Sequence, residues 1–270
     1  ELPSPVSDRL RLQFHITQYG NREHLMLVRN ITRLHQLEQM RKDFVANVSH
    51  ELRTPLTVIS GYLETLLDNV EDVNPRWLRA LQQMQQQGGR MQNLLNDLLL
   101  LAKLEATDYP SDNQPVAVDL LLLSIKNDAQ ALSGERGHRI SLEADPHLKL
   151  KGSETELRSA FSNLVFNAVK YTPNEGDIHV RWWGDEQGAH LSVQDSGLGI
   201  EAKHLPRLTE RFYRVDSSRA SNTGGTGLGL AIVKHVLLRH RARLDISSTL
   251  GQGSAFTCNF PTQQVVRRGQ

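Results

Sequence analysis

The segment at residues 49–55, which reads Ser-His-Glu-Leu-Arg-Thr-Pro, brings together residue types that can do nucleophilic chemistry. His50 should face solvent on a long amphipathic helix, because it points roughly opposite Val48 and Leu52 at ~100° per residue. A neutral imidazole nitrogen can attack an electrophile while Glu51 accepts the second ring proton. A solvated surface histidine beside a glutamate would look the same, so the rest of the chain has to decide between them.

The helix that carries His50 is predicted from about residue 34 to residue 70, because its apolar residues recur at three- and four-residue spacing. Pro55 removes a backbone donor and should bend this helix just after His50. A second helix should begin at Asn74-Pro75 and run antiparallel to the first. Two such helices cannot cover their own apolar stripes, which predicts a four-helix bundle in a homodimer.

Three glycine-containing clusters lie further along the chain, at residues 195–199, 224–230 and 251–253. Glycines at the start of a helix let backbone amides approach phosphate oxygens, and the helix N-terminus favours negative charge. The middle cluster precedes a predicted helix and is therefore a candidate phosphate cradle. The chain has neither a Walker-type motif nor a dinucleotide fingerprint, which argues against those two classes of nucleotide site.

Three polar residues share one face of the helix predicted at 153–171, namely Asn163, Asn167 and Lys170. Amide oxygens suit a Mg²⁺ ion that arrives with its nucleotide, and the ammonium group suits phosphate. An ordinary solvated helix face would show the same pattern. The combination with the glycine clusters favours a nucleotide site.

The second half of the chain alternates between helical and strand-like segments, which predicts a mixed sheet with helices on one face. The predicted helices are 119–133, 153–171 and 229–240. The predicted strands are 138–144, 147–151, 177–183, 189–195, 242–248 and 254–260. The irregular segment 200–227, called the lid segment below, is long enough to be functional. Near the N-terminus, alternation at 10–16 and 25–28 around a turn at 18–21 predicts a hairpin.

Composition excludes several classes of function. The 270 residues include 31 basic and 30 acidic side chains, and the net charge of +1 gives no sign of a nucleic-acid partner. Cys258 is expected to be a small buried hydrophobe in a reducing compartment. No apolar run reaches membrane-spanning length. The chain starts without Met, so we expect a fragment of a longer protein.

Five sequence blocks in family order make the chain resemble the bacterial sensor histidine kinases over residues 35–262. Those blocks are the H box at 44–55 (FVANVSHELRTP), the N box at 163–172 (NLVFNAVKYT), the first G box at 195–199, the F box at 208–214 (LTERFYR) and the second G box at 225–230. Details at 207–216 and 226–235 are most similar to kinases that control phosphate regulons.

The resemblance implies an α + α/β protein, in which a dimeric antiparallel helical hairpin precedes a GHKL-type α/β sandwich that binds ATP. The expected ranges are 1–33 for the remnant of an upstream PAS-like sensor domain, 34–106 for the dimerisation and histidine-phosphotransfer domain, 107–117 for a linker, 118–262 for the catalytic ATP-binding domain and 263–270 for a tail.

The resemblance also implies roles for individual residues. His50 would be the phosphoacceptor, Glu51 its activating base, and Thr54 the residue that orients water for dephosphorylation of a response regulator. Asn167 would be the principal Mg²⁺ ligand, with Asn163 close to the metal and the phosphates.

The remaining implied roles concern ATP. Lys170 and Tyr171 would line the site, and Asp195 would accept the adenine amino group. Gly197 and Gly199 would let adenine approach the backbone, and Arg214 would reach the phosphates. The second G box would close over them, through Gly225, Thr226, Gly227, Leu228, Gly229 and Leu230.

The implied cofactors are ATP and Mg²⁺, and the implied partners are a second copy of the chain and a response regulator, expected to be that of the phosphate regulon. The chain would be the cytoplasmic portion of an inner-membrane protein. Three alternatives stay open. They are the same chemistry in another two-component pathway, a GHKL ATPase that acts as a clamp, and a hairpin that serves only as a dimerisation scaffold. The ATPase-clamp alternative requires an acidic residue that activates water for hydrolysis, and this chain has Asn163 at that position.

Overall fold

The computed structural model describes residues 2–4, 7–19, 23–33, 52–54, 56–67, 75–106, 114–215 and 226–267. It divides into two compact units, Glu1–Thr54 and Pro55–Gln270. Among the described residues, no helix combines the length and the apolar character needed to cross a membrane.

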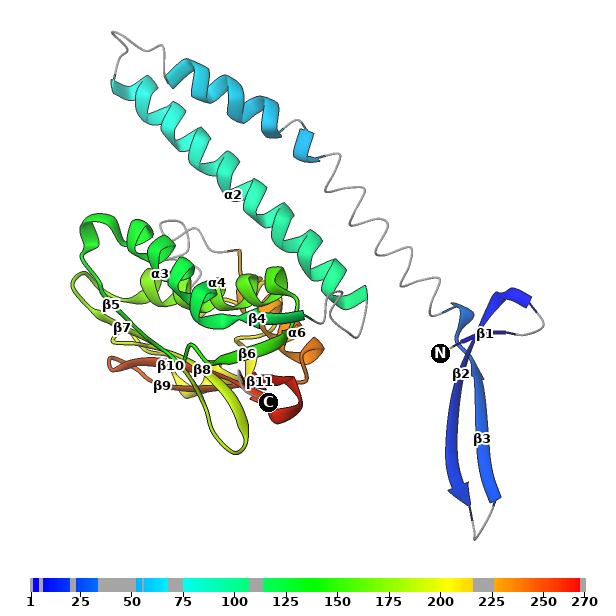
Figure 1. The fold of residues 1–270 in the computed structure, drawn as a ribbon. Coiled ribbons are helices and arrows are strands. Elements are labelled where there is room, and N and C mark those ends of the chain that lie inside the picture. The colour runs from blue at the N-terminus through cyan, green and yellow to red at the C-terminus, as the bar shows by residue number, and fades with distance from the viewer. Residues whose placement is uncertain are drawn as a thin grey trace. The chain divides into compact units, whose positions relative to one another are not determined.

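The first unit contains an antiparallel hairpin of β2 (Ser7–Tyr19) and β3 (Glu23–Asn30), with β1 (Leu2–Ser4) paired to β2 (Figure 1). The predicted hairpin is confirmed. Its turn is shorter than predicted, because Gln18 and Tyr19 still pair with residues of β3. Four consecutive apolar side chains at 25–28 are exposed, so both faces of β3 are uncovered. An isolated hairpin is only marginally stable, and its assignment to an upstream PAS-like domain stays a prediction.

The second unit begins with a helical hairpin, formed by the helical residues 56–67 and by α2 (Pro75–Ala106), which run antiparallel (Figure 1). The two helices pack closely, since a side-chain carbon on Gly88 of α2 would lie 3.3 Å from Ser60 Oγ. α2 begins at Pro75 as predicted. The N-terminal half of the predicted first helix, at 34–51, and the bend at Pro55 lie outside the described residues.

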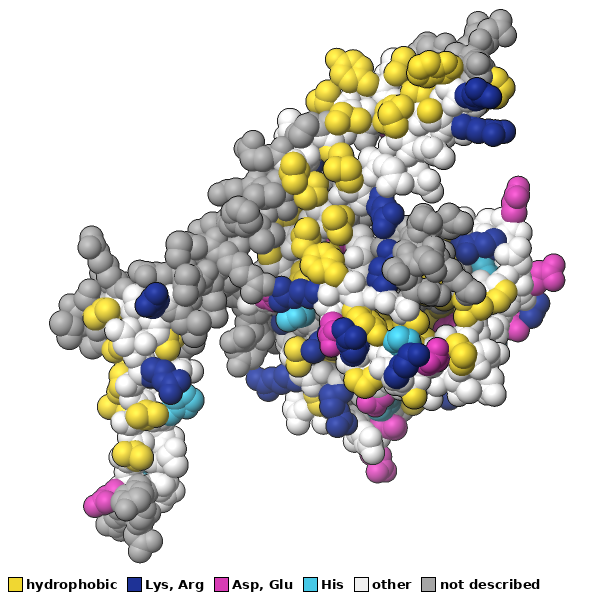
Figure 2. All heavy atoms as spheres, turned by 180° about the vertical axis from the view of Figure 1, so that it is seen from behind, with side chains coloured by type: hydrophobic (Ala, Val, Ile, Leu, Met, Phe, Trp, Pro, Cys, Tyr) yellow, Lys and Arg dark blue, Asp and Glu magenta, His cyan; other side chains and the backbone are white. Residues whose placement is uncertain are grey.

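The helical hairpin carries a row of exposed apolar side chains, which Figure 2 shows gathered along it. Leu56, Leu63 and Leu95 are buried in the hairpin. The large apolar residues exposed on the described part of the hairpin are Val58, Ile59, Tyr62, Leu66, Trp77, Met84 and Met91. So much uncovered apolar surface on one element is typical of an interaction face.

A five-stranded mixed sheet forms the centre of the remaining part, in the order β5-β7-β8-β10-β9. The strands are β5 (Arg139–Ala144), β7 (Asp177–Gly184), β8 (Gly188–Asp195), β9 (Arg243–Thr249) and β10 (Gly253–Pro261). β5 and β7 are parallel, and the other pairs are antiparallel. The helices α3 (Val118–Ser133), α4 (Glu154–Tyr171) and α6 (Gly229–Arg239) cover one face of this sheet (Figure 1). The predicted mixed sheet with helices on one face is confirmed.

A second sheet of three short strands corrects the sequence interpretation. It has the order β11-β6-β4, with β4 at Gln114–Ala117, β6 at Leu148–Gly152 and β11 at Val265–Arg267. Residues 114–117 were expected in the linker, 265–267 in the tail, and β6 in the main sheet. Hydrophobic burial explains the arrangement, because Val116 pairs with Leu150 and both side chains are buried. Short 3-10 turns at Gly134–Arg136, Ala202–Arg207 and Thr262–Gln264 complete the described elements.

The core lies between the sheet and its helices. Phe260 makes edge-to-face contacts with Phe161 and Trp182, at centroid distances of 6.1 and 6.3 Å. Cys258 is fully buried, as predicted, and burial raises the pKa of its thiol. The C-terminal part of α2 belongs to the same core, since Leu101 and Leu104 are buried in it.

Candidate nucleotide-binding site

Asn163 and Gly229 bring two predicted motifs into contact. α4 begins after the extended N-cap residue Ser153. Leu157 and Phe161 lie on its buried face, whereas Asn163 and Asn167 are half-buried on another face. Asn163 Nδ2 donates a hydrogen bond of 2.8 Å to the carbonyl of Ser159, so its Oδ1 is the atom left to bind a ligand. A side-chain carbon on Gly229 would lie 2.4 Å from that oxygen. The first turn of α6 therefore starts directly beside the asparagine face of α4.

Three cationic side chains lie near one another at the end of α4. The pKa of Lys170 is lowered to about 8, first by burial and then by the charges of Arg214 and Arg90. Its Nζ also lies 5.2 Å from the centre of the Tyr171 ring. Burial raises the pKa of Tyr171, and Arg214 opposes that shift. Such a cluster is strained by its own repulsion, which a bound polyanion would relieve.

Asp195 lies at the end of β8 and is buried. Burial raises the pKa of its carboxyl group, while the backbone amides of Gly197 and Ser254 donate hydrogen bonds that lower it. The Gly197 amide lies 2.8 Å from Asp195 Oδ1. Two amides leave further lone pairs on the carboxylate, so Asp195 can still accept a hydrogen bond from a ligand.

Gly197 and Gly199 hold the backbone close to its neighbours. A side-chain carbon on Gly197 would lie 2.7 Å from the Tyr171 carbonyl oxygen. Gly199 has a φ of +65°, and a side-chain carbon there would lie 2.0 Å from the Thr249 carbonyl oxygen. A side chain at either position would displace the backbone that frames Asp195.

Within the lid segment, Phe212 contacts Gly227 at the segment's C-terminal end. The Phe212 amide donates a hydrogen bond of 2.9 Å to the Gly227 carbonyl. Both residues have positive φ, +62° and +74°, and a side-chain carbon on Gly227 would lie 2.9 Å from the Phe212 backbone. Leu228 is fully buried and its amide donates a hydrogen bond of 3.2 Å to Thr226 Oγ1, while Leu230 packs against the core. Gly225 lies outside the described residues.

Two acidic residues of α2 also contact this region, and the sequence analysis missed both. Thr226 Oγ1 donates to Asp97 Oδ2 at 2.8 Å, and burial raises the pKa of Asp97 while this hydrogen bond lowers it. Glu105 pairs with Arg211 of the F box and lies 3.3 Å from His235 Nε2. Arg90, Asp97 and Glu105 repeat at seven- and eight-residue spacing, which marks one face of α2 and was the available signal.

The residues predicted for phosphotransfer are not placed relative to this site. His50 and Glu51 lie outside the described residues. Thr54 is exposed on a short helical stretch of the first unit.

The chain matches two protein families in sequence order. Residues 40–107 match the family described as His Kinase A (phospho-acceptor) domain. Residues 152–264 match the family described as histidine kinase-, DNA gyrase B-, and HSP90-like ATPase.

Curated relatives extend the likeness over nearly the whole chain. The chain is 83% identical over 265 residues to the phosphate regulon sensor protein PhoR of Pseudomonas aeruginosa, covering 98% of this chain and 60% of that protein. It is 42% identical to PhoR of Haemophilus influenzae, with coverages of 93% and 58%. It is 33% identical to the sensor histidine kinase WalK of Bacillus subtilis, with coverages of 94% and 43%. The chain therefore spans less than two thirds of the length of these relatives.

Solved structures support the fold. Full-length ShkA, solved in complex with AMPPNP, matches with a TM-score of 0.69 and 27% identity, covering 84% of this chain and 47% of that one. The histidine kinase AdeS of Acinetobacter baumannii matches with a TM-score of 0.57 and 20% identity, covering 80% and 98%. The predicted order of a helical hairpin followed by a GHKL-type α/β domain is confirmed.

Proposed function

We propose, from the premise that the chain belongs to the sensor histidine kinase family, that it transfers the γ-phosphoryl group of ATP to His50 and from there to an aspartate of a response regulator. The observation that carries this proposal is the contact between Asn163 and Gly229. It places candidate metal ligands beside the first turn of a helix whose amides and dipole favour phosphate.

The asparagine pair fits a Mg²⁺ ion that is bound together with ATP. The chemistry of the donor set agrees, because Asn163 keeps its amide oxygen available while its nitrogen is used by Ser159. Asn167 is the proposed principal ligand. When bound, the ion would neutralise charge on the transferring phosphoryl group.

Cationic side chains of the protein would bind the phosphate groups of ATP. Burial lowers the pKa of Lys170 first, and the positive charges of Arg214 and Arg90 lower it further, so a bound triphosphate would replace repulsion by attraction. The lid segment and the second G box, from Gly225 to Leu230, would cover the phosphates and exclude water.

Asp195 is the proposed acceptor for the exocyclic amine of adenine. Guanine presents a carbonyl oxygen at the same position, which a carboxylate repels. Gly197 and Gly199 let the base lie against backbone, since side chains there would collide with neighbouring carbonyl groups. This geometry supports selection of ATP over GTP.

The acceptor step forms a phosphorus–nitrogen bond. One ring nitrogen of His50 attacks the γ-phosphorus as the bond to the β,γ-bridging oxygen breaks and ADP leaves, while Glu51 takes up the proton from the other nitrogen. The phosphoryl group then passes to the regulator's aspartate. In the reverse signalling state, Thr54 would orient water against the regulator's acyl phosphate.

The assembly we propose is a homodimer in which the exposed apolar row of the helical hairpin packs against that of a second copy. The 83% identity to a PhoR protein supports phosphate-starvation signalling, with the phosphate-regulon regulator as partner. The chain would then be the cytoplasmic portion of an inner-membrane protein.

The deciding experiment compares His50→Gln with His147→Gln after incubation with γ-labelled ATP. His147 is an exposed histidine outside the site and serves as the matched control. We expect His50→Gln to bind ATP normally and to lose all protein-bound label, while His147→Gln keeps it. Label that persists in His50→Gln would overturn the phosphoacceptor assignment. Phosphate release without any protein-bound label in the unmodified chain would instead favour the ATPase clamp.

A further inference from the structure

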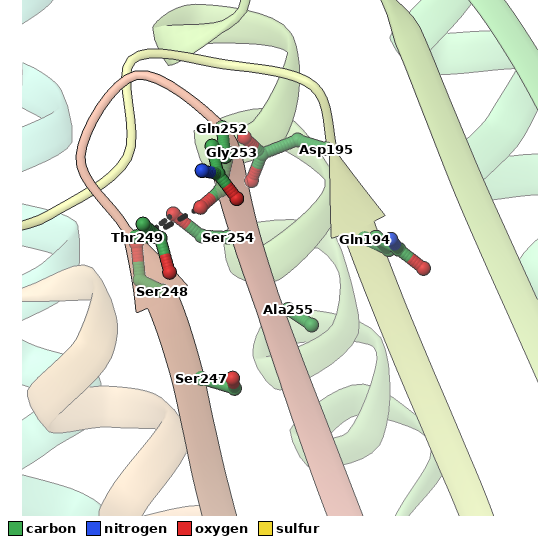
Figure 3. Close-up of a pocket in the computed structure, with 9 residues that line it drawn as sticks. All are labelled: Gln194, Asp195, Ser247, Ser248, Thr249, Gln252, Gly253, Ser254 and Ala255. Carbon is green, nitrogen blue, oxygen red and sulfur yellow. Dashed lines mark hydrogen bonds between the residues drawn. The ribbon is translucent and has the colours of Figure 1, made fainter.

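Ser248 is one of the residues that line a small polar pocket at the ends of β8, β9 and β10. The pocket has a volume of about 150 Å³ and is lined by Asp195, Ser248 and Ser254 among others (Figure 3). Ser248, Ser254 and Asp195 stand in register on three neighbouring strands, because Ser254 pairs with Ser248 on one side and with Asp195 on the other.

The Ser248 hydroxyl takes part in three hydrogen bonds. It donates to the Gly253 carbonyl at 3.0 Å, and it accepts from the Ile200 amide at 2.8 Å. Its third partner is Ser254 Oγ, at 2.9 Å. A hydroxyl group has one proton and two lone pairs. Since the proton goes to Gly253, Ser254 must be the donor in the hydroxyl pair, and every position on Ser248 is filled.

This arrangement gives the Ser254 hydroxyl a fixed direction. Its proton points to Ser248, so its lone pairs are directed elsewhere and it presents itself as an acceptor. The Ser254 backbone amide meanwhile donates to Asp195. The side chain and the backbone of one residue thus link Ser248 to the carboxylate proposed to accept the base.

Ser248 also joins the two turns that frame Asp195. Ile200 directly follows the first G box, and Gly253 ends the turn between β9 and β10. The same turns are tied together by a hydrogen bond of 2.7 Å from the Gly251 amide to the Leu198 carbonyl. Gly253 must be glycine, because a side-chain carbon there would lie 1.9 Å from the Asp195 carbonyl oxygen at a φ of +101°.

We propose that Ser248 is a positioning residue for purine recognition, which holds the two turns in place and orients Ser254 as an acceptor beside Asp195. The proposal rests on the proposed binding of ATP. Two neighbouring hydrogen-bond acceptors favour a purine that has an amine at position 6 and disfavour one that has a carbonyl oxygen there. Loss of Ser248 should therefore change base selectivity, and not only overall affinity.

The test measures Kd for Mg-ATP and for Mg-ITP, which differ by an amine against a carbonyl oxygen at position 6 of the purine. We expect the unmodified chain to prefer ATP, and Ser248→Ala to lower the ATP-to-ITP affinity ratio by about three- to tenfold, the range of one or two lost hydrogen bonds. Ser247→Ala is the matched control, because Ser247 borders the same pocket on the same strand but takes no part in the described network. It should leave the ratio unchanged.

A second variant protects the test from a folding defect. Ser254→Ala removes the other half of the hydroxyl pair and should lower the ratio similarly, and the double variant should show little further loss. If Ser248→Ala does not fold, Ser254→Ala carries the same measurement.

The outcomes separate the two proposals. A proportional loss of both affinities with an unchanged ratio would make Ser248 merely structural and overturn the inference. Absence of adenine-nucleotide binding in the unmodified chain would instead reject the proposed function.

Discussion

Thr226 Oγ1 donates a hydrogen bond of 2.8 Å to Asp97 Oδ2, which joins the second G box to α2 across 129 positions of sequence. Arg211, earlier in the lid segment, pairs with Glu105 of the same helix. Acidic residues of α2 thus contact the described part of the lid segment at two places, Arg211 and Thr226. A displacement of α2 relative to the lid segment would therefore have to break one or both of these contacts.

Replacement of Asp97 by Asn should stabilise the protein at neutral pH. Burial raises the folded-state pKa of Asp97, so its charged form costs stability above that pKa and costs nothing below the ordinary value of 3.8. An amide oxygen still accepts from Thr226. We expect Asp97→Asn to raise Tm by roughly 2–4 °C at pH 7, with a gain that shrinks as the pH falls toward 3.8.

The control for Asp97 is Glu186→Gln, which removes an exposed carboxylate in the β7–β8 turn and should not change Tm. A lower Tm for Asp97→Asn at pH 7 would show that the carboxylate stabilises the interface through its charge.

Nucleotide affinity should fall as the pH rises through the pKa of Lys170. That pKa is about 8, so the side chain is mostly protonated at pH 7 and mostly neutral at pH 9. Phosphate attracts the protonated form, and Kd for Mg-ATP should therefore rise several-fold across this range. Lys170→Arg stays charged and should flatten the profile. An equally steep profile in Lys170→Arg would assign the titration to another group.

Gly227→Ala should impair nucleotide binding more than the unfavourable φ explains. The new carbon would lie 2.9 Å from the Phe212 backbone, so the contact between Phe212 and residue 227 must open. Gly134→Ala is the matched control, because Gly134 also has positive φ but nothing lies within 4 Å of the new carbon. We expect both variants to lose about 1–2 kcal/mol of stability from strain, and only Gly227→Ala to weaken Mg-ATP binding in titration calorimetry. Equal nucleotide binding in the two variants would contradict this view of the lid.

Removal of Arg239 should destabilise the domain strongly. Its guanidinium forms a buried bidentate pair with Glu156, at 2.9 and 3.0 Å, and also donates to the Leu104 carbonyl. Arg239→Ala leaves a buried carboxylate unpaired and should cost about 3–5 kcal/mol in denaturant unfolding. The double variant Arg239→Met/Glu156→Leu should recover most of this loss. Similar losses for the single and double variants would show that packing, and not the unpaired charge, dominates.

The sequence predicted the main elements because they carry strong local signals. The helices α3, α4 and α6 and the strands of the main sheet lie within about two residues of their predicted ranges, since periodic burial and turn residues mark their ends. β4 and β11 were missed because segments of four and three residues gain their strand character from pairing with β6, which only the folded chain provides. Asp97 and Ser248 were missed for the same reason. Asp97 contacts Thr226 across 129 positions of sequence, and Ser248 contacts Ile200 across 48, so these contacts exist only in the folded chain.

α2 is shared between the hairpin and the core of the nucleotide-binding part, because Leu101 and Leu104 are buried in that core. Burial of one leucine contributes about 1.5–3 kcal/mol, so exposing both on separation would cost roughly 3–6 kcal/mol. A change of about 5.5 kcal/mol is enough to turn a population of 1:99 into 99:1. A ligand would therefore have to bind an arrangement with these two leucines exposed roughly 10⁴-fold more tightly than the docked one in order to make it predominate.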